Sequence, residues 1–579
     1  MIITNYNEVF VSSCDIVNIT KHVIEINEPK MLDLELDINK NVQIHYYHSD
    51  WGDEFSPRCV DLDNDNKEFY FDSNMGRNAK HSNPNFYVVH DNLVSLFHIA
   101  WSGNFKVNFK RDKKLKIQVL LETGFTSILE PGERFQGFDV VYTIAQKSLN
   151  VASQNLHTFV REVIYNKNKF LPPVVWNHWW SYEDIAINED IFKSNVEIAS
   201  KLGFEYAMLD AGWFGDKSKF WELIRGDWHL YNKQRFPSGI KSLSDFVKNK
   251  GMKFGIWIEI EGLGSESSIY TDKPWLIAMN GTNSLEYICL GAEKNQNWAF
   301  EQFKMLIEDF GAEYIKLDFN LDPKKGCNCA NHDHGPNDGL YAHYKGLYKV
   351  LKKVKEKYPS ILLENCSSGG LRADMALLEN MDVCFMSDPD YSEHSHQCYQ
   401  GFRNFLPPER IFHFSWSHAI FKGRYAIPQF DFNNLNLTKE IKKYTIRTVS
   451  HHAFGISHPL IDYNENDLLL ISNEINIHKK YIQKIVKSKL FCPDNLTIKN
   501  FQGNRNPYYI YENNNEILIY CYGLEMSEYK QEIDLKKLGL KYKKLEVKNE
   551  IDINYVLNGD QLTVKNKQQT ASILLLKKV

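Results

Sequence analysis

Between residues 170 and 483, short apolar runs that end in polar residues alternate with longer segments of helical apolar spacing. Continuous apolar runs are typical of parallel strands buried on both faces, whereas the longer spacing predicts amphipathic helices. The predicted helices include 189–202, 298–310 and 340–357. The strand-like runs lie at 174–179, 206–213, 254–261, 314–320, 361–370, 383–390 and 411–416, with a poorly marked eighth near 452–460. This alternation predicts a (β/α)8 barrel.

The regions on either side of this barrel have a different pattern. Short β-branched and aromatic runs, separated by turn clusters, fill residues 1–165, and no helical periodicity persists there. Similar runs return from about 485. We therefore predict a multidomain α/β protein with an N-terminal β-sandwich over 1–165, a barrel over 170–483 and a C-terminal antiparallel β-sandwich over 485–579.

Composition excludes several classes of protein. The chain has 579 residues and a net charge of −5, so it lacks the basic surface that nucleic acid or an anionic membrane requires. No segment approaches the roughly 18 apolar residues of a membrane span, and the N-terminus does not resemble a signal peptide. The ten scattered cysteines do not form a disulfide framework. We expect a soluble, cytoplasmic protein with reduced thiols and without a nucleic-acid or membrane partner.

The run 314–320 is the most informative strand, because it ends in Lys316, Asp318 and Asn320. A barrel collects its chemistry at the C-terminal ends of its strands. Residues two apart on a strand point to the same face, so we expect Lys316 to lower the pKa of Asp318 and keep it ionised. The alternative is a structural ion pair at a strand end.

Polar or aromatic residues also end the other predicted strands, namely Trp179, Asp210, Trp257, Glu259, Glu261, Cys366 and Asp388. Such a ring predicts a pocket with carboxylates and aromatic walls. Cleavage of a glycoside requires two carboxylates on opposite sides of a sugar. An ionised Asp318 suits the nucleophile, and Asp388, without a cation on its own strand, suits the acid.

Several sequence motifs point to a known family. Residues 209–215 read Leu-Asp-Ala-Gly-Trp-Phe-Gly, and 364–372 read Glu-Asn-Cys-Ser-Ser-Gly-Gly-Leu-Arg. Further motifs lie at 226–228, 236–240, 251–261, 314–320 and 387–388, and in the N-terminal region at 49–54, 83–86, 101–104 and 129–133. Together they resemble the family-36 glycoside hydrolases, the melibiase-type α-galactosidases, over nearly the whole chain.

The resemblance implies a retaining exo-α-glycosidase in which Asp318 is the nucleophile and Asp388 the acid/base. It implies an oligosaccharide or glycoconjugate substrate, no cofactor, no metal and a homo-oligomer. The substrate-binding residues that it implies are Trp179, Asp210, Trp257, Lys316, Asn320, Cys366, Gly369 and Arg372.

The chain departs from the family pattern at position 211. Where these enzymes have two aspartates that grip the 4- and 6-hydroxyls of galactose, this chain has Asp210 and Ala211. Pro389 and Ile260 are also unusual, and 290–294 gives no match to the family's substrate-binding arginine. The terminal sugar is therefore either galactose or N-acetylgalactosamine, and we expect the α-N-acetylgalactosaminide to be hydrolysed at least as well as the α-galactoside.

Two other functions share these features. A transglycosylase of the raffinose-synthase kind has the same fold and carboxylates but transfers the sugar to an acceptor other than water. A carbohydrate-binding protein with a decayed site is the second rival, and the presence of Asp318, Asp388 and Lys316 argues against it.

Two motifs remain outside this assignment. Cys327, Cys329, His332 and His334 have the ligand types of a zinc site, although their spacing is tighter than in zinc fingers. We favour the alternative, a loop without metal that faces the substrate or a neighbouring subunit. The run 393–396, Glu-His-Ser-His, either holds the leaving-group sugar or begins a solvated helix.

Overall fold

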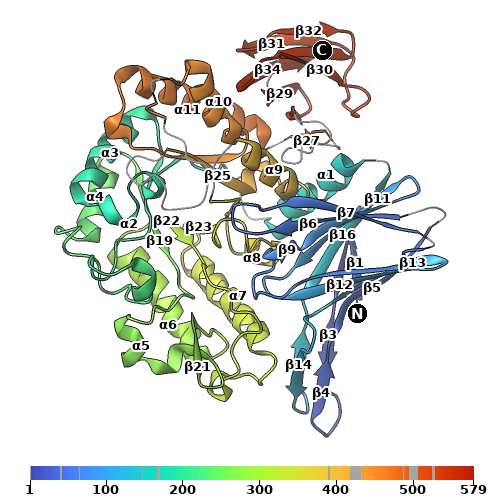
Figure 1. The fold of residues 1–579 in the computed structure, drawn as a ribbon, viewed down its shortest axis with the longest axis vertical. Helices are drawn as coiled ribbons and strands as arrows, with labels where there is room; N and C mark the ends of the chain where they lie inside the picture. Colours follow the sequence, from blue (N-terminus) through green and yellow to red (C-terminus); the bar gives the residue numbers. More distant parts are fainter. Residues whose placement is uncertain are drawn as a thin grey trace.

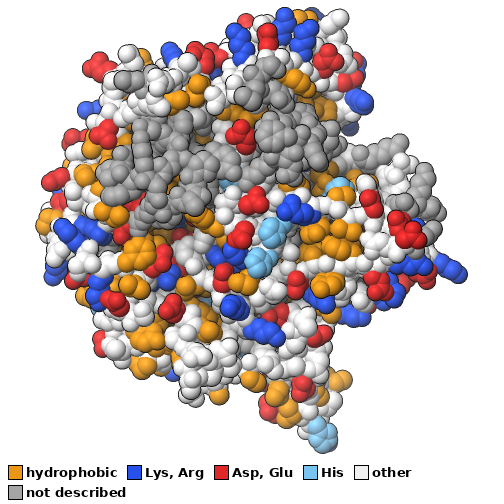
Figure 2. All heavy atoms as spheres, in the orientation of Figure 1, with side chains coloured by type: hydrophobic (Ala, Val, Ile, Leu, Met, Phe, Trp, Pro, Cys, Tyr) orange, Lys and Arg blue, Asp and Glu red, His pale blue; other side chains and the backbone are white. Residues whose placement is uncertain are grey.

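The computed structural model describes residues 2–38, 42–63, 65–146, 148–165, 170–388, 392–417, 432–434, 436–486, 488–493, 506–524 and 528–579. Figure 1 shows a β-rich N-terminal region beside a central barrel, with a smaller set of C-terminal sheets packed above both. On the face seen in Figure 2, basic and acidic side chains of the described residues are interspersed. The predicted fold class is confirmed.

The N-terminal region consists of two main antiparallel sheets with alternating burial. In β12 (Phe105–Arg111), Phe105, Val107 and Phe109 point into the core between the sheets, as period-two alternation requires. The larger sheet has the order β1 (Ile2–Tyr6), β2 (Val9–Ser13), β16 (Asp139–Gln146), β11 (Leu93–Ala100), β10 (Asn85–His90), β6 (Val42–Ser49) and β7 (Ser56–Leu62), with β9 (His81–Ser82) beside β6. The smaller sheet has the order β5 (Lys30–Asp37), β13 (Lys114–Leu120), β12 and β8 (Glu68–Ser73).

Two short strand pairs extend from these sheets, and one helix follows them. The pairs are β14 (Thr126–Leu129) with β4 (Ile24–Asn27), and β15 (Arg134–Gln136) with β3 (Asp15–Val17). The helix, α1 (Leu149–Phe159), corrects our expectation that residues 1–165 lack helical periodicity. Its N-cap is Ser148, and Leu149, Ala152 and Leu156 form its buried face.

Eight parallel strands close the central barrel, including the poorly marked eighth. Most of their residues are buried, because the helices cover the outside and side chains fill the inside. The strands are β17 (Val175–Asn177), β18 (Tyr206–Leu209), β19 (Lys253–Ile258), β22 (Tyr314–Leu317), β23 (Leu362–Asn365), β24 (Val383–Phe385), β25 (Ile411–Trp416) and β26 (Ala453–Ser457).

Helices follow the barrel strands, and α3 (Glu189–Leu202) begins and ends at the expected signals. It begins where the side chain of Asn188 accepts the Ile191 N–H at 3.0 Å, and it ends at Gly203, which has a φ of +99°. The other long helices are α2 (Trp179–Ala186), α4 (Ile240–Asn249), α6 (Glu293–Lys304), α7 (Gly339–Lys357), α9 (Ser392–Phe402), α10 (Lys439–Val449) and α11 (Glu465–Ile485). Of the described helices, none is both long enough and apolar enough to cross a membrane.

Two further parts complete the fold. A hairpin of β20 (Ile277–Asn280) and β21 (Asn283–Ile288) is inserted between β19 and α6. The larger C-terminal sheet has the order β27 (Lys489–Phe491), β28 (Tyr508–Glu512), β29 (Glu516–Gly523), β34 (Thr570–Lys578) and β31 (Leu545–Ile551). The smaller one has the order β30 (Tyr529–Asp534), β33 (Gln561–Asn566) and β32 (Tyr555–Asn558).

Candidate active site

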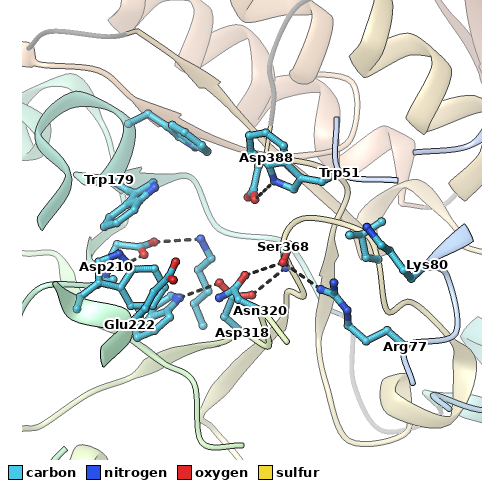
Figure 3. Close-up of a pocket in the computed structure, with 16 residues that line it drawn as sticks. Trp51, Arg77, Lys80, Trp179, Asp210, Glu222, Asp318, Asn320, Ser368 and Asp388 are labelled. Carbon is cyan, nitrogen blue, oxygen red and sulfur yellow. Dashed lines mark hydrogen bonds and ion pairs between the residues drawn. The ribbon is translucent and has the colours of Figure 1, made fainter. Parts of the chain in front are cut away.

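A cavity of about 320 Å³ lies at the carboxyl ends of the barrel strands, where (β/α)8 barrels collect their chemistry. Figure 3 shows Asp318 and Asp388 on opposite sides of it. Residues of the N-terminal sandwich complete its wall. The lining residues are Trp51, Arg77, Lys80, Trp179, Trp180, Asp210, Ala211, Trp221, Glu222, Trp257, Lys316, Asp318, Asn320, Ser368, Leu371 and Asp388.

Asp318 immediately follows β22, and three N–H groups hold its carboxylate. Oδ2 accepts the indole N–H of Trp257 at 3.1 Å. Oδ1 accepts the backbone N–H groups of Phe319 at 2.8 Å and Ser368 at 3.1 Å. Donors of this kind orient a carboxylate.

Lys316 pairs with Asp210, which corrects the expectation that it pairs with Asp318. Lys316 Nζ lies 3.0 Å from Asp210 Oδ2, and both side chains are almost fully buried. Burial alone would raise the pKa of Asp210, but the charge of Lys316 and hydrogen bonds from Asn177 and the Ala211 N–H bring it below its usual range. The pair therefore forms a fixed, charged polar group inside the cavity.

The reason for this pairing lies in the layering of the barrel. Side chains in one layer come from alternate strands. Asp210 follows β18 and Lys316 lies on β22, and β19 separates these two strands. Lys316 also lies over the ring of Phe385, with Nζ 4.9 Å from the ring centre, so its stem crosses the barrel interior.

Asp388 has the opposite electrostatic character. Burial and the nearby charge of Asp318 raise the pKa of its carboxyl to about 7, against the opposing effects of Lys316 and a hydrogen bond from Trp51. The Trp51 indole N–H donates to Oδ2 at 2.8 Å. The Asp318 carboxylate is therefore held by hydrogen-bond donors, whereas the Asp388 carboxyl retains its proton up to neutral pH.

Tryptophans form the wall near Asp210. The rings of Trp179 and Trp221 meet edge to face with centres 6.0 Å apart, and those of Trp221 and Trp257 do so at 5.3 Å. Such rings offer apolar faces to the C–H groups of a sugar. Glu222, next to Trp221, brings a further carboxylate to this end of the cavity, as Figure 3 shows.

Three of the predicted binding residues do not line the cavity. Cys366 is fully buried beneath it, and burial raises the pKa of its thiol well above its usual range. Gly369 has a φ of +78°, and a Cβ added there would lie only 2.7 Å from the Asp388 backbone nitrogen, so glycine allows this loop to pass close to Asp388. Arg372 is fully buried and donates to Glu261 at 2.8 Å.

The two glutamates after β19 are structural. Glu261 accepts from Arg372 and lies 2.8 Å from His343 Nε2, and all three side chains are fully buried. Glu259 pairs with Arg225 at 3.0 Å and accepts both the backbone and the amide N–H of Asn320. Glu259 thus orients Asn320, which lines the cavity.

Sequence reasoning missed the residues that come from outside the barrel strands. Trp51, Arg77 and Lys80 belong to the N-terminal sandwich, and Glu222 lies in a connection after β18. Arg77 Nη1 donates to Phe319 O at 3.1 Å and to Ser368 Oγ at 3.0 Å, so it holds the loops beside Asp318. The motif 49–54 was the one available signal, since it contains Trp51.

Both interpretations of the run 393–396 are wrong in part. α9 does begin there, but His394 and His396 are fully buried and do not line the cavity. His394 Nε2 lies 2.8 Å from Ser387 Oγ and 2.9 Å from Glu54 Oε2, directly behind Asp388. Residues 389–391, including Pro389, lie outside the described residues.

Comparisons with known proteins agree with this geometry. The family model of melibiase matches residues 134–400, and the model of the glycosyl hydrolase family 36 N-terminal domain matches 2–124. The α-galactosidase Mel36A of Lactobacillus acidophilus is 32% identical over 324 residues, which are 53% of this chain and 44% of that protein. AgaA of Geobacillus stearothermophilus, also an α-galactosidase, is 28% identical over 55% of this chain and 45% of its own. The chain thus matches less than half the length of these relatives.

Solved structures share the fold over nearly the whole chain. The crystal structure of AgaA superposes with a TM-score of 0.83 at 19% identity, covering 99% of this chain and 80% of AgaA. The galactosidase domain of the α-galactosidase-sucrose kinase AgaSK also gives a TM-score of 0.83, over 99% of this chain and 78% of that domain. All the domains described above therefore have counterparts in these structures.

Proposed function

Because this chain belongs to glycoside hydrolase family 36, we propose that it is a retaining exo-α-glycosidase that releases a terminal α-linked galactose. Asp318 is the nucleophile and Asp388 the acid/base. The observation that carries this proposal is the pair of carboxyls on opposite sides of one cavity, with three N–H donors on Asp318 and a pKa of about 7 for Asp388. Glycoside cleavage by double displacement requires one carboxyl that attacks C1 and another that donates a proton to the leaving oxygen.

In the first step, protonated Asp388 gives its proton to the glycosidic oxygen while the bond from that oxygen to C1 breaks. An oxygen of Asp318 forms a bond to C1 from the opposite face, which yields a glycosyl ester and the free leaving alcohol. The Trp257 and Ser368 N–H groups on Asp318 fix the direction of its attacking oxygen.

In the second step, the Asp388 carboxylate takes a proton from water as that water attacks C1. The ester bond to Asp318 breaks, Asp318 regains its charge, and Asp388 regains its proton. Two inversions at C1 retain the α configuration in the released sugar.

The sugar-binding end of the cavity contains Asp210, Lys316 and Glu222. Charged donors and acceptors of this kind bind sugar hydroxyls, and each such bond contributes about 1.5–3 kcal/mol. Ala211 also lines this wall, so the second aspartate of the family pattern is absent there. We propose that Glu222 supplies the carboxylate that Ala211 lacks, which favours galactose, in contrast to the expectation from Ala211 that the α-N-acetylgalactosaminide is hydrolysed at least as well.

The opposite side of the cavity receives the leaving group. Trp51 and Lys80 lie there, and Lys80 is held by an ion pair with Asp50. Figure 3 places both residues away from Asp210 and Glu222. Variants of AgaA were crystallised in complex with stachyose and with raffinose, which supports an oligosaccharide as the substrate class here.

Turnover of p-nitrophenyl α-glycosides of galactose, N-acetylgalactosamine, glucose and arabinopyranose tests the proposal. We expect the highest kcat/KM for the α-galactoside and free α-galactose as the first product. A protein that hydrolyses none of the four would contradict the assignment. With raffinose, transfer of galactose to an acceptor sugar instead of its release would show a transglycosylase.

A further inference from the structure

Two cysteines and two histidines meet at one point beside the loop that follows Asp318. Cys289 follows β21, Cys327 lies in the long loop after β22, and His332 and His334 come shortly after it. One donor atom from each residue lies within 4.8 Å of all the others. Cys327 Sγ is 3.3 Å from His332 Nδ1, and Cys289 Sγ is 3.4 Å from His334 Nε2.

Hydrogen bonds fix both imidazoles with a lone pair toward the thiols. His332 Nε2 lies 2.9 Å from the carbonyl oxygen of Trp275, and His334 Nδ1 lies 2.8 Å from that of Gly335. A carbonyl oxygen only accepts, so each of these nitrogens carries the proton. In the neutral imidazoles the remaining nitrogens, Nδ1 of His332 and Nε2 of His334, have a lone pair that faces the sulfurs, as in histidine ligands of metals.

The surroundings of Cys327 suit a thiolate. Its Sγ accepts the backbone N–H groups of Met279 and Cys329, each at 3.3 Å. Cys289, Cys327 and His332 are buried, and none of the four residues lines the cavity that contains Asp318. This cluster is therefore separate from the proposed catalytic site.

We propose that Cys289, Cys327, His332 and His334 bind a zinc ion in a tetrahedral Cys2His2 site. Zinc–sulfur and zinc–nitrogen bonds of about 2.3 and 2.0–2.1 Å at the tetrahedral angle place sulfur and nitrogen about 3.6 Å apart. The two sulfur–nitrogen distances above are within about 0.3 Å of that value. Four protein ligands leave no position for water, which is typical of a structural zinc site.

This site differs from the one that the sequence motif suggested. Cys329 is not among the four residues, and its place is taken by Cys289 from the inserted hairpin. The ligand set thus joins the hairpin of β20 and β21 to the loop after β22. Spacing within the motif 327–334 could not reveal this, because the fourth ligand lies far earlier in the chain.

The ion would anchor the loop that leaves the catalytic strand. Between Asp318 and Cys327, Asp322 pairs with Arg77, and Arg77 in turn contacts Phe319 O and Ser368. The Tyr287 hydroxyl accepts the Cys327 N–H at 2.9 Å, which ties the same loop to β21. A zinc ion there would fix the path of the chain behind the nucleophile without contacting the sugar.

Metal analysis of the full chain, purified without chelators or affinity-tag metals, is the first test. We expect about one zinc per chain and background amounts of iron, nickel and copper. Cys289→Ser and His334→Ala should lower zinc to background. The matched control is Cys329→Ser, which removes a neighbouring cysteine and should retain about one zinc per chain. Stoichiometric iron instead of zinc, or equal loss in Cys329→Ser and Cys289→Ser, would overturn the proposal.

Cobalt substitution tests the geometry in the unaltered chain, so it does not depend on the folding of any variant. Zinc is removed and Co²⁺ added, and the visible absorption is recorded. Tetrahedral Co²⁺ with thiolate ligands gives intense ligand-field bands and a sulfur-to-cobalt charge-transfer band in the near ultraviolet. Absence of these bands, together with absence of zinc in the purified protein, would show that the four side chains bind no metal.

Discussion

Trp51 donates its indole N–H to Oδ2 of Asp388 at 2.8 Å, across a sequence separation of 337 residues. The donor belongs to the N-terminal sandwich, and the acceptor follows a barrel strand. This bond favours the ionised form of Asp388 and opposes the larger effect of burial, which raises its pKa. The sandwich therefore takes part in setting the protonation of the proposed acid.

Trp51→Phe should move the alkaline limb of the pH profile to higher pH. The acid works only when protonated, so kcat/KM of the unaltered protein should fall as pH rises through about 7, the pKa of Asp388. Removing the donor raises this pKa further, by about one unit if the bond contributes roughly 1.5 kcal/mol. Trp179→Phe, whose ring lies at the other end of the cavity, should lower kcat/KM without moving the limb. A shift toward lower pH in Trp51→Phe would contradict the assignment.

Asp318→Ala should abolish turnover while the fold is retained, because it removes the group that we propose attacks C1. Azide should restore turnover of an activated aryl α-galactoside and yield β-galactosyl azide, the inverted product. Asp388→Ala provides the contrast, since an activated aryl group leaves without the acid, Asp318 forms the ester, and azide then attacks that ester to give the α-azide. The anomers can be assigned by NMR. Near-normal activity of Asp318→Ala without azide would exclude it as the nucleophile.

Asp388→Asn should be severe for substrates with poor leaving groups and mild for activated ones. A general acid contributes about 10²–10⁴-fold when the departing oxygen is basic, and little when it is not. We therefore expect a large loss on raffinose and a small loss in kcat/KM on a dinitrophenyl α-galactoside. Equal losses across leaving groups of different pKa would show that another residue protonates the glycosidic oxygen.

Lys316→Met should weaken both catalysis and folding, because it leaves the buried Asp210 carboxylate without its cation. Breaking a buried pair on one side costs about 3–5 kcal/mol. Adding Asp210→Asn removes the stranded charge, so the double variant should unfold at a higher urea concentration than Lys316→Met alone. Both should remain poor enzymes, since the polar group that we propose binds the sugar is lost. If the double variant were the less stable, Asp210 would not depend on Lys316 for its charge.

Glu222→Gln should lower kcat/KM for the α-galactoside by about 10- to 100-fold, the effect of losing one charged hydrogen bond. Ala211→Asp in that background should restore part of the loss by returning a carboxylate to the same wall. Comparing the α-galactoside with the α-N-acetylgalactosaminide on all the variants separates the two sugars. An unaltered protein that prefers the N-acetylgalactosaminide, with no effect of Glu222→Gln, would show that Glu222 does not replace the missing aspartate.

The barrel was predictable because seven of its eight strands carry a clear signal of their own. A run such as 314–317 is apolar and ends in polar residues, and its place in the order of strands follows from the sequence. Parallel strands also place their carboxyl ends at one rim, which brought Asp318 and Asp388 to the same cavity.

The side-chain pairs that form across the barrel interior were not predictable from the sequence. Lys316 is close in sequence to Asp318 but pairs with Asp210, because layering joins alternate strands. Arg372 shares a motif with Ser368, yet it faces the buried Glu261. No periodicity in residues 40–90 indicates that Trp51, Arg77 and Lys80 reach the barrel, since that contact depends on how two domains pack.

Trp51, Arg77 and Lys80 form a wall of the cavity without carrying out the chemistry that we assign to the barrel. One of the contacts that set the acidity of Asp388, the hydrogen bond from Trp51, thus comes from a different part of the chain than Asp318. Changes confined to the sandwich could adapt the working pH and the choice of leaving group while the nucleophile and its strand stay constant. Directed evolution toward new conditions therefore has its natural starting point in residues 49–80.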